Sequence, residues 1–131
     1  MKQIKRQFYL QQLIDGKQNG LIKIITGIRR CGKSYLLFKL FTQYLLSSGV
    51  QDDHIIRIAL DDIESKELRD PLLLYKHIKG RMADEELYYV LLDEVQLVSD
   101  FEDVLNSYLQ VKNADLYVTG SNARFLSKDI V

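Results

Sequence analysis

The chain of 131 residues has one cysteine and one proline, and no apolar run approaches the roughly 18–20 residues that a membrane-spanning helix needs. A single cysteine excludes an internal disulfide framework and favours a reducing compartment. Residues 1–13 are interrupted by glutamine, lysine and arginine, which is not typical of a signal peptide. One proline and seven glycines favour regular elements joined by short connections. These absences predict a cytoplasmic protein without a membrane segment.

Hydrophobic residues make up 47% of the chain, enough for one domain over residues 1–131 with its own core. The formal net charge is zero, but residues 1–50 carry nine basic side chains and one acidic one (+8), and residues 51–131 carry nine basic and 17 acidic ones (−8). A basic segment favours an anionic ligand or nucleic acid. The alternative is that the two parts neutralise each other on one folded surface. A net charge of zero argues against strong non-specific binding to nucleic acid.

Segments typical of strands and helices alternate along the chain. Short apolar and β-branched runs predict strands, and longer stretches with helical spacing predict helices. The strands are expected over 21–28, 54–60, 88–95 and 115–122, and the helices over 1–15, 33–48, 71–79 and 101–109. The third strand has almost no polar alternation, so it should be covered on both faces. The pattern predicts an α/β sandwich around a parallel sheet.

Three side chains are predicted to cap helices at their N-termini. Asp61 with Glu64, and Ser99 with Glu102, have the spacing of a capping box. Asp70 is a good N-cap because the next residue is a proline, which is favoured at the first helical position.

Residues 27–34 read GIRRCGKS and match the phosphate-loop (Walker A) pattern G-x-x-x-x-G-K-[ST] at every fixed position. Gly27 and Gly32 let the chain turn tightly, so that backbone N–H groups can reach a phosphate without a Cβ in the way. Lys33 supplies a positive charge at the terminal phosphates, and the Ser34 hydroxyl is placed to ligate magnesium. The motif lies between an apolar strand and a helix, whose positive end points at the same anion.

Four further residues in or beside this motif are candidates for nucleotide binding: Arg29, Arg30, Cys31 and Tyr35. The two arginines either add positive charge around the nucleotide or reach a partner; the alternative is that they are solvated. Cys31 follows cationic residues and precedes a helix, conditions that lower the pKa of a thiol. A catalytic thiol is not expected, because neither histidine lies near it in the sequence.

Residues 90–94 read VLLDE and form a second candidate site (Walker B). The apolar residues of this strand bring Asp93 and Glu94 to its carboxyl end, where open α/β sheets bind ligands. Asp93 is expected to hold magnesium through water, and Glu94 to polarise the attacking water. By itself a strand-terminal acid often only caps the next turn, but the phosphate loop about 60 residues upstream favours the functional interpretation.

The fourth strand ends in a polar turn, Thr119 to Asn122. A hydroxyl or amide here would hold the γ-phosphate or the attacking water, and Ser121 or Asn122 is the candidate. The alternative is an ordinary turn of glycine, serine and asparagine. The sequence does not choose between the two residues.

With GIRRCGKS, LLDEVQ and VTGSNA in this order, the chain resembles the AAA-type ATP-binding proteins of the P-loop superfamily, above all a prokaryotic group whose loop reads G-I-R-R-x-G-K-[ST]. The resemblance implies ATP or ADP and Mg²⁺ as ligands, and a sheet in which the phosphate-loop strand lies beside the fourth strand. The resemblance implies a nucleotide loop that contains Gly27, Gly32, Lys33 and Ser34. It also implies that the magnesium and catalytic acids are Asp93 and Glu94, and that the sensor is Ser121 or Asn122.

Such proteins continue beyond the sensor turn into a fifth strand, a helical lid with further arginines and usually a C-terminal domain. The chain is therefore expected to be an ATPase core that stops before the fifth strand. An uncovered edge on the phosphate-loop strand would then favour self-association or capping by another segment.

The leading functional hypothesis is an enzyme, a magnesium-dependent ATPase in which Lys33 and Glu94 are catalytic and nucleotide state drives or regulates a partner domain. A second hypothesis is a nucleotide-binding module with little hydrolysis, because a missing arginine finger alone removes about 10³–10⁵ in rate. A third is a DNA-associated regulatory ATPase, from the basic segment and the resemblance. A kinase is less favoured because no acceptor site is visible, and a GTPase because no N-K-x-D stretch occurs.

Overall fold

The computed structural model describes residues 2–26 and 31–121, with side chains for 7–26 and 32–121. In chain order the elements are α1 (Lys2–Asp15), β1 (Lys23–Ile25), α2 (Cys31–Ser34), η1 (Tyr35–Phe41), α3 (Thr42–Ser47), η2 (Asp52–His54), β2 (Ile55–Ala59), η3 (Ile63–Arg69), α4 (Pro71–Arg81), β3 (Tyr88–Asp93), η4 (Val95–Leu97), α5 (Phe101–Leu109) and β4 (Ala114–Thr119). The segment η1 is π-helical, and η2, η3 and η4 are 3₁₀-helical. In the described part, none of the helices combines the length and apolarity that crossing a membrane requires.

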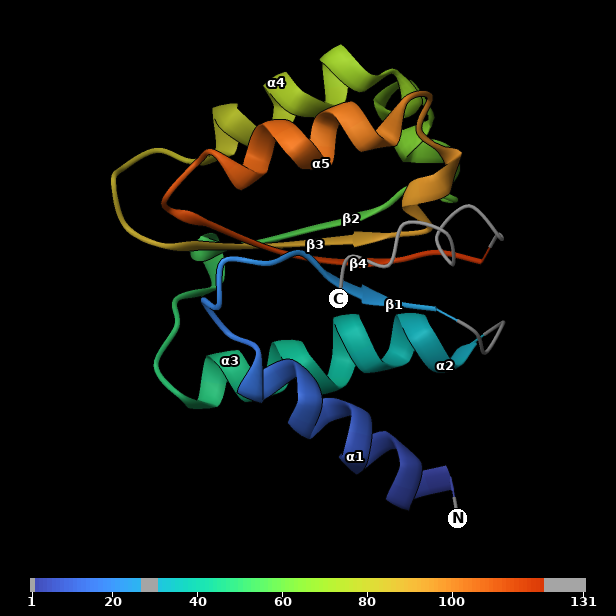
Figure 1. Cartoon of the computed structure of the whole chain (residues 1–131), viewed down its shortest axis with the longest axis vertical. Coiled ribbons are helices and arrows are strands. Elements are labelled where there is room, and N and C mark those ends of the chain that lie inside the picture. The colour runs from blue at the N-terminus through green and yellow to red at the C-terminus, as the bar shows by residue number, and fades with distance from the viewer. Residues whose placement is uncertain (1, 27–30, 122–131) are drawn as a thin grey trace.

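The four strands form one parallel sheet in the order β1-β4-β3-β2. Helix α1 and the helical run from α2 to α3 cover one face of this sheet, and α4 and α5 cover the other (Figure 1). The predicted α/β sandwich is therefore confirmed. The expectation that the phosphate-loop strand lies beside the fourth strand is confirmed too, because β1 pairs with β4.

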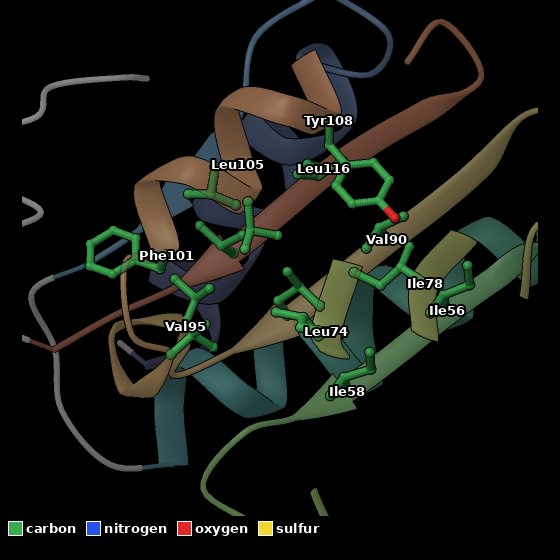
Figure 2. Packing of buried hydrophobic residues seen from close by; sticks show 14 of the residues in the cluster. Ile56, Ile58, Leu74, Ile78, Val90, Val95, Phe101, Leu105, Tyr108 and Leu116 are labelled. Atoms are coloured by element: carbon green, nitrogen blue, oxygen red, sulfur yellow. The ribbon is translucent and has the colours of Figure 1, made fainter. Parts of the chain in front are cut away.

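Strand β3 is buried along its whole length, as its sequence predicts. Tyr88, Val90 and Leu92 pack into the apolar cluster between the sheet and α4 and α5. Figure 2 shows Val90 in this cluster. Tyr89 and Leu91 point the other way, into the cluster under α1 and the α2–α3 run. Burying one such side chain contributes about 1.5–3 kcal/mol, so the two cores hold the strand firmly between the helical layers.

The helix predicted over 33–48 is one continuous helical run, α2, η1 and α3, which begins two residues earlier than expected. Its buried side chains include Leu36, Leu37 and Phe41, and they face the sheet. The hydroxyl of Thr42, the first residue of α3, donates a hydrogen bond at 3.2 Å to the carbonyl of Leu37 in the π-helical part. The run therefore packs as the mostly apolar circumference predicts.

The prediction that Asp61 caps the helical segment after the second strand is wrong; this segment is η3. Asp62 is the N-cap, and its carboxylate accepts the Glu64 N–H at 3.0 Å. A turn in which the Asp62 N–H donates to the carbonyl of residue 59 delays the start of the helix by one residue. The prediction for Ser99 is wrong for a similar reason: its N–H donates to the carbonyl of residue 69, and the N-cap of α5 is Asp100.

The predicted cap at Asp70 is confirmed, since its carboxylate accepts the Leu73 N–H at 3.0 Å. The helix continues through Gly80 to Arg81, two residues beyond the predicted end. We expect Asp70→Ala to lower the free energy of unfolding by about 1 kcal/mol, because an N–H at the helix start loses its partner. Asp70→Asn keeps an acceptor oxygen and should lose much less. Urea unfolding of both variants tests this, and equal losses would contradict the capping role.

A buried ion pair joins the amino ends of β1 and β4, at the other end of these strands from Ile25 and Thr119. The Lys23 ammonium lies 2.7 Å from an Asp115 carboxylate oxygen, and both side chains are buried. The other Asp115 oxygen accepts the Tyr117 hydroxyl at 2.8 Å and the Gln18 N–H at 2.9 Å. Burial raises the pKa of Tyr117, which therefore stays a donor. This network is structural, because its polar atoms are satisfied within the chain.

Candidate functional site

The carboxyl ends of β3 and β4 and the start of the helical run after β1 meet at one edge of the sheet (Figure 1). This follows from the parallel pairing, which puts Leu92 opposite Val118 and Ile25 opposite Thr119. Residues that directly follow these strands therefore lie close together, although they are about 60 and 90 positions apart in the sequence.

Asp93 is held by two hydroxyl groups from different elements. Ser34 donates a hydrogen bond to Oδ2 at 2.6 Å, and Thr119 donates one to Oδ1 at 2.6 Å. The carboxylate is 2% exposed, and burial raises the pKa of Asp93 above its ordinary value while the two hydrogen bonds oppose the shift. The two residues predicted to hold magnesium, Ser34 and Asp93, are thus in direct contact.

Lys33 is also 2% exposed, and its ammonium group lies at the same edge of the sheet. It donates hydrogen bonds to the Gly120 carbonyl at 2.9 Å and to the Ser121 hydroxyl at 2.7 Å. Both partners are neutral, and no carboxylate within the described residues forms an ion pair with it. A buried charge without a counter-charge is unfavourable, so the site favours an anion.

Glu94 follows Asp93 in an unusual backbone conformation. Its φ and ψ of 57° and 50° lie in the left-handed region, which favours glycine and is uncommon for other residues. Its N–H donates to the Thr119 hydroxyl oxygen at 2.8 Å. Its carboxylate accepts the Ser121 hydroxyl at 3.0 Å and the Gln96 amide at 2.7 Å. This acidic side chain therefore shares a hydrogen-bond partner, Ser121, with the Lys33 ammonium.

The structure brings five of the predicted site residues together: Lys33, Ser34, Asp93, Glu94 and Ser121. The other predicted site residues form two groups, one outside the described residues and one in the helical run after β1. Gly27, Arg29, Arg30, Asn122 and the side chain of Cys31 lie outside the described residues. Gly32 is part of α2, and Tyr35 begins η1 directly after Ser34 and is 39% exposed.

Sequence reasoning missed three groups that the site uses: the Thr119 hydroxyl, the Gly120 carbonyl and the Gln96 amide. Thr119 lay within the predicted polar turn, but the role there was assigned to Ser121 or Asn122. The one available signal was its place in the polar turn that ends the fourth predicted strand. The carbonyl and the amide carried no signal in the sequence.

The donor set suits a magnesium nucleotide. Mg²⁺ prefers hard oxygen ligands and is usually held by one or two protein oxygens together with substrate phosphates. Ser34 and Asp93 offer such oxygens 2.6 Å apart, and Lys33 offers a positive charge for a phosphate. The parallel sheet, the helix that follows β1 and these residues define the class of the protein, which is a P-loop nucleoside-triphosphatase fold.

The chain belongs to the AAA domain family, whose sequence profile matches residues 19–131. An uncharacterized protein of Haemophilus influenzae is 35% identical over 128 residues, which is 97% of this chain and 32% of the relative. Two uncharacterized proteins of Methanocaldococcus jannaschii are 30% and 26% identical over 113 and 116 residues, or 83% and 87% of this chain and 23% and 24% of the relatives. The chain thus spans about a third or less of these relatives. No solved structure matches it significantly. Membership of this family suggests nucleotide binding and ATPase activity.

Proposed function

We propose that the chain binds ATP together with Mg²⁺ and hydrolyses it to ADP and phosphate. The observation that carries this proposal is the buried ammonium of Lys33, whose hydrogen-bond partners in the described residues are both neutral. A terminal phosphate supplies the missing counter-charge. No other feature of the described site explains why a lysine is buried there.

In the bound state Lys33 exchanges the Gly120 carbonyl and the Ser121 hydroxyl for phosphate oxygens. Ser34 would hold Mg²⁺ directly and Asp93 would hold it through water, and the phosphate-loop motif, with Gly27 and Gly32 at its fixed positions, would supply backbone N–H groups to the phosphates. When bound, the metal neutralises charge on the phosphate oxygens. Burial disfavours the ionised form of Asp93, and a nearby cation favours it.

Glu94 is the general base of the proposed reaction. It accepts a proton from water while the water oxygen forms a bond to the γ-phosphorus. The bond from that phosphorus to the bridging oxygen breaks, and ADP leaves with the electron pair. Lys33 balances the negative charge on the transferred group. Ser121 contacts both residues, which supports it as the sensor of the γ-phosphate; Asn122 remains the other candidate.

Three wider proposals follow from the family and the charge distribution. Because the relatives are more than three times as long as this chain, the hydrolysis cycle is proposed to act on a partner domain. Self-association is proposed at β1, which lies at an edge of the sheet in the described part. A DNA-associated role stays an alternative based on the +8 charge of residues 1–50. A binding module with little hydrolysis stays the other alternative.

Cys31 provides a direct test of occupancy, because it is the only cysteine and belongs to the phosphate-loop motif. We expect Mg-ATP at ten times its Kd to slow alkylation of Cys31 about tenfold, since only the free chain reacts. Mg-GTP should protect less if the site prefers adenine. The urea-unfolded chain is the control, because ATP should not change its rate. Equal rates in the folded chain with and without nucleotide would contradict binding at this loop.

A further inference from the structure

We infer that Thr119 is a positioning residue of the ATPase site, whose one hydroxyl sets both the magnesium-binding carboxylate of Asp93 and the backbone of the catalytic Glu94. This inference rests on the proposed function and adds to it a residue that touches neither nucleotide nor metal. It is carried by the two hydrogen bonds that the Thr119 oxygen makes, one as a donor and one as an acceptor.

The hydroxyl group of Thr119 is both a donor and an acceptor of hydrogen bonds. Its proton goes to Asp93 Oδ1 at 2.6 Å, and its oxygen accepts the Glu94 N–H at 2.8 Å. Thr119 is 0% exposed, so solvent does not offer replacement partners. Removing the hydroxyl therefore leaves one carboxylate oxygen and one backbone N–H without a partner at the same time.

The position of Thr119 in the sheet restricts the direction of its hydroxyl group. It is the last residue of β4, which lies between β1 and β3 and is paired with both. Its β-branched side chain has a restricted χ1 angle, so the hydroxyl direction follows from the strand. An oxygen held in this way can orient a neighbouring carboxylate more accurately than an exposed, unbranched side chain can.

For Asp93, Thr119 is the contact that remains when the metal is bound. In the nucleotide-free chain two hydroxyls hold the carboxylate, Ser34 on Oδ2 and Thr119 on Oδ1. In the proposed function the Ser34 hydroxyl turns to Mg²⁺. The Thr119 bond to Oδ1 then remains as a protein contact that orients the carboxylate, and loss of outer contacts of this kind typically lowers metal affinity about 10- to 100-fold.

For Glu94, Thr119 supports a backbone conformation that is unfavourable by itself. The left-handed φ of 57° persists only where surrounding contacts hold it. The hydrogen bond from the Glu94 N–H to Thr119 is such a contact, and Glu94 directly follows Asp93 in the chain. The same hydroxyl thus couples the direction of the Glu94 side chain to the position of Asp93.

The test compares Thr119→Val, which keeps the shape and removes the hydroxyl, with Thr119→Ser, which keeps the hydroxyl. ATP binding in EDTA is measured first, and then the Mg²⁺ concentration that half-saturates turnover. We expect Thr119→Val to bind ATP in EDTA within about twofold of wild type, and to need about tenfold more Mg²⁺ with a lower maximal rate. Thr119→Ser should restore both.

Thr42→Val is the matched control, because Thr42 is also buried and its hydroxyl bonds only the Leu37 carbonyl within the helical run. It should leave the Mg²⁺ requirement unchanged. If Thr119→Val does not fold, Thr119→Cys replaces it, with a shift in the same direction expected. An unchanged Mg²⁺ requirement in a folded hydroxyl-free variant, or a tenfold shift in Thr119→Ser, overturns the inference. Wild-type protein that binds no ATP under either condition instead overturns the proposed function on which it rests.

Discussion

Lys33→Ala is expected to weaken Mg-ATP binding by about 100-fold or more. Lys33 is the buried cation of the site, and its two neutral partners are replaced by phosphate oxygens in the proposed complex. A hydrogen bond to a charged group contributes about 1.5–3 kcal/mol, and an ammonium group makes more than one to a polyphosphate. At about 1.4 kcal/mol for each factor of ten, two such bonds exceed 100-fold. Isothermal titration calorimetry measures the change.

The matched control is Lys39→Ala, an equal change of charge on an exposed lysine of the same helical run. It should bind Mg-ATP as the wild type does. Thermal unfolding of both variants verifies that each is folded, so that the comparison concerns binding. Lys33→Ala is expected to remain folded because it removes a buried charge that lacks an acidic partner in the described residues. Wild-type affinity in folded Lys33→Ala would remove the phosphate-binding role from this residue.

Glu94→Gln is expected to keep Mg-ATP binding within a few-fold and to lower the turnover rate about 10²- to 10⁴-fold. That range is the usual contribution of a general base. The substitution preserves the shape of the side chain, and its amide oxygen still accepts hydrogen bonds from Ser121 and Gln96. The loss therefore reports the missing base and not a rearranged site. Release of phosphate under saturating Mg-ATP measures it.

The matched control is Glu85→Gln, which makes the same chemical change away from the site. Glu85 is exposed and precedes the amino end of β3, whereas Glu94 follows its carboxyl end, so this variant should turn over ATP normally. Equal turnover in wild type and Glu94→Gln would show that another group activates the water. A wild-type chain that binds ATP and releases no phosphate would favour the binding-module alternative, since an arginine finger supplied by a partner can contribute about 10³–10⁵ in rate.

Local sequence patterns predicted those parts of the fold that depend on neighbouring residues. The apolar run of β3 required cover on both faces, and the structure buries all six of its residues. Asp70 before a proline predicted a cap, and its carboxylate bonds the Leu73 N–H. The caps at Asp61 and Ser99 were wrong by one residue, because backbone hydrogen bonds to residues 59 and 69 decide where each helix begins.

The candidate site shows the same division between local and distant information. The phosphate-loop and acidic motifs identified Lys33, Ser34, Asp93 and Glu94, since each motif states which residue types the chemistry needs. The geometry that joins them was not readable, because Ser34 and Asp93 are 59 positions apart and Asp93 and Thr119 are 26 apart. The role of Thr119 depends on strand neighbours, and its side chain carries no motif of its own.

The alternation of strands and helices, the two burial faces of β3 and the chemistry offered by the loop follow from hydrophobic period and residue type, so they could be predicted from the order of residues. The fold was needed to show which hydroxyl holds which carboxylate oxygen, which carbonyl receives the Lys33 ammonium, and that Glu94 takes a left-handed conformation. The physical reason is that these contacts form across the sheet, where parallel pairing brings the ends of distant segments together.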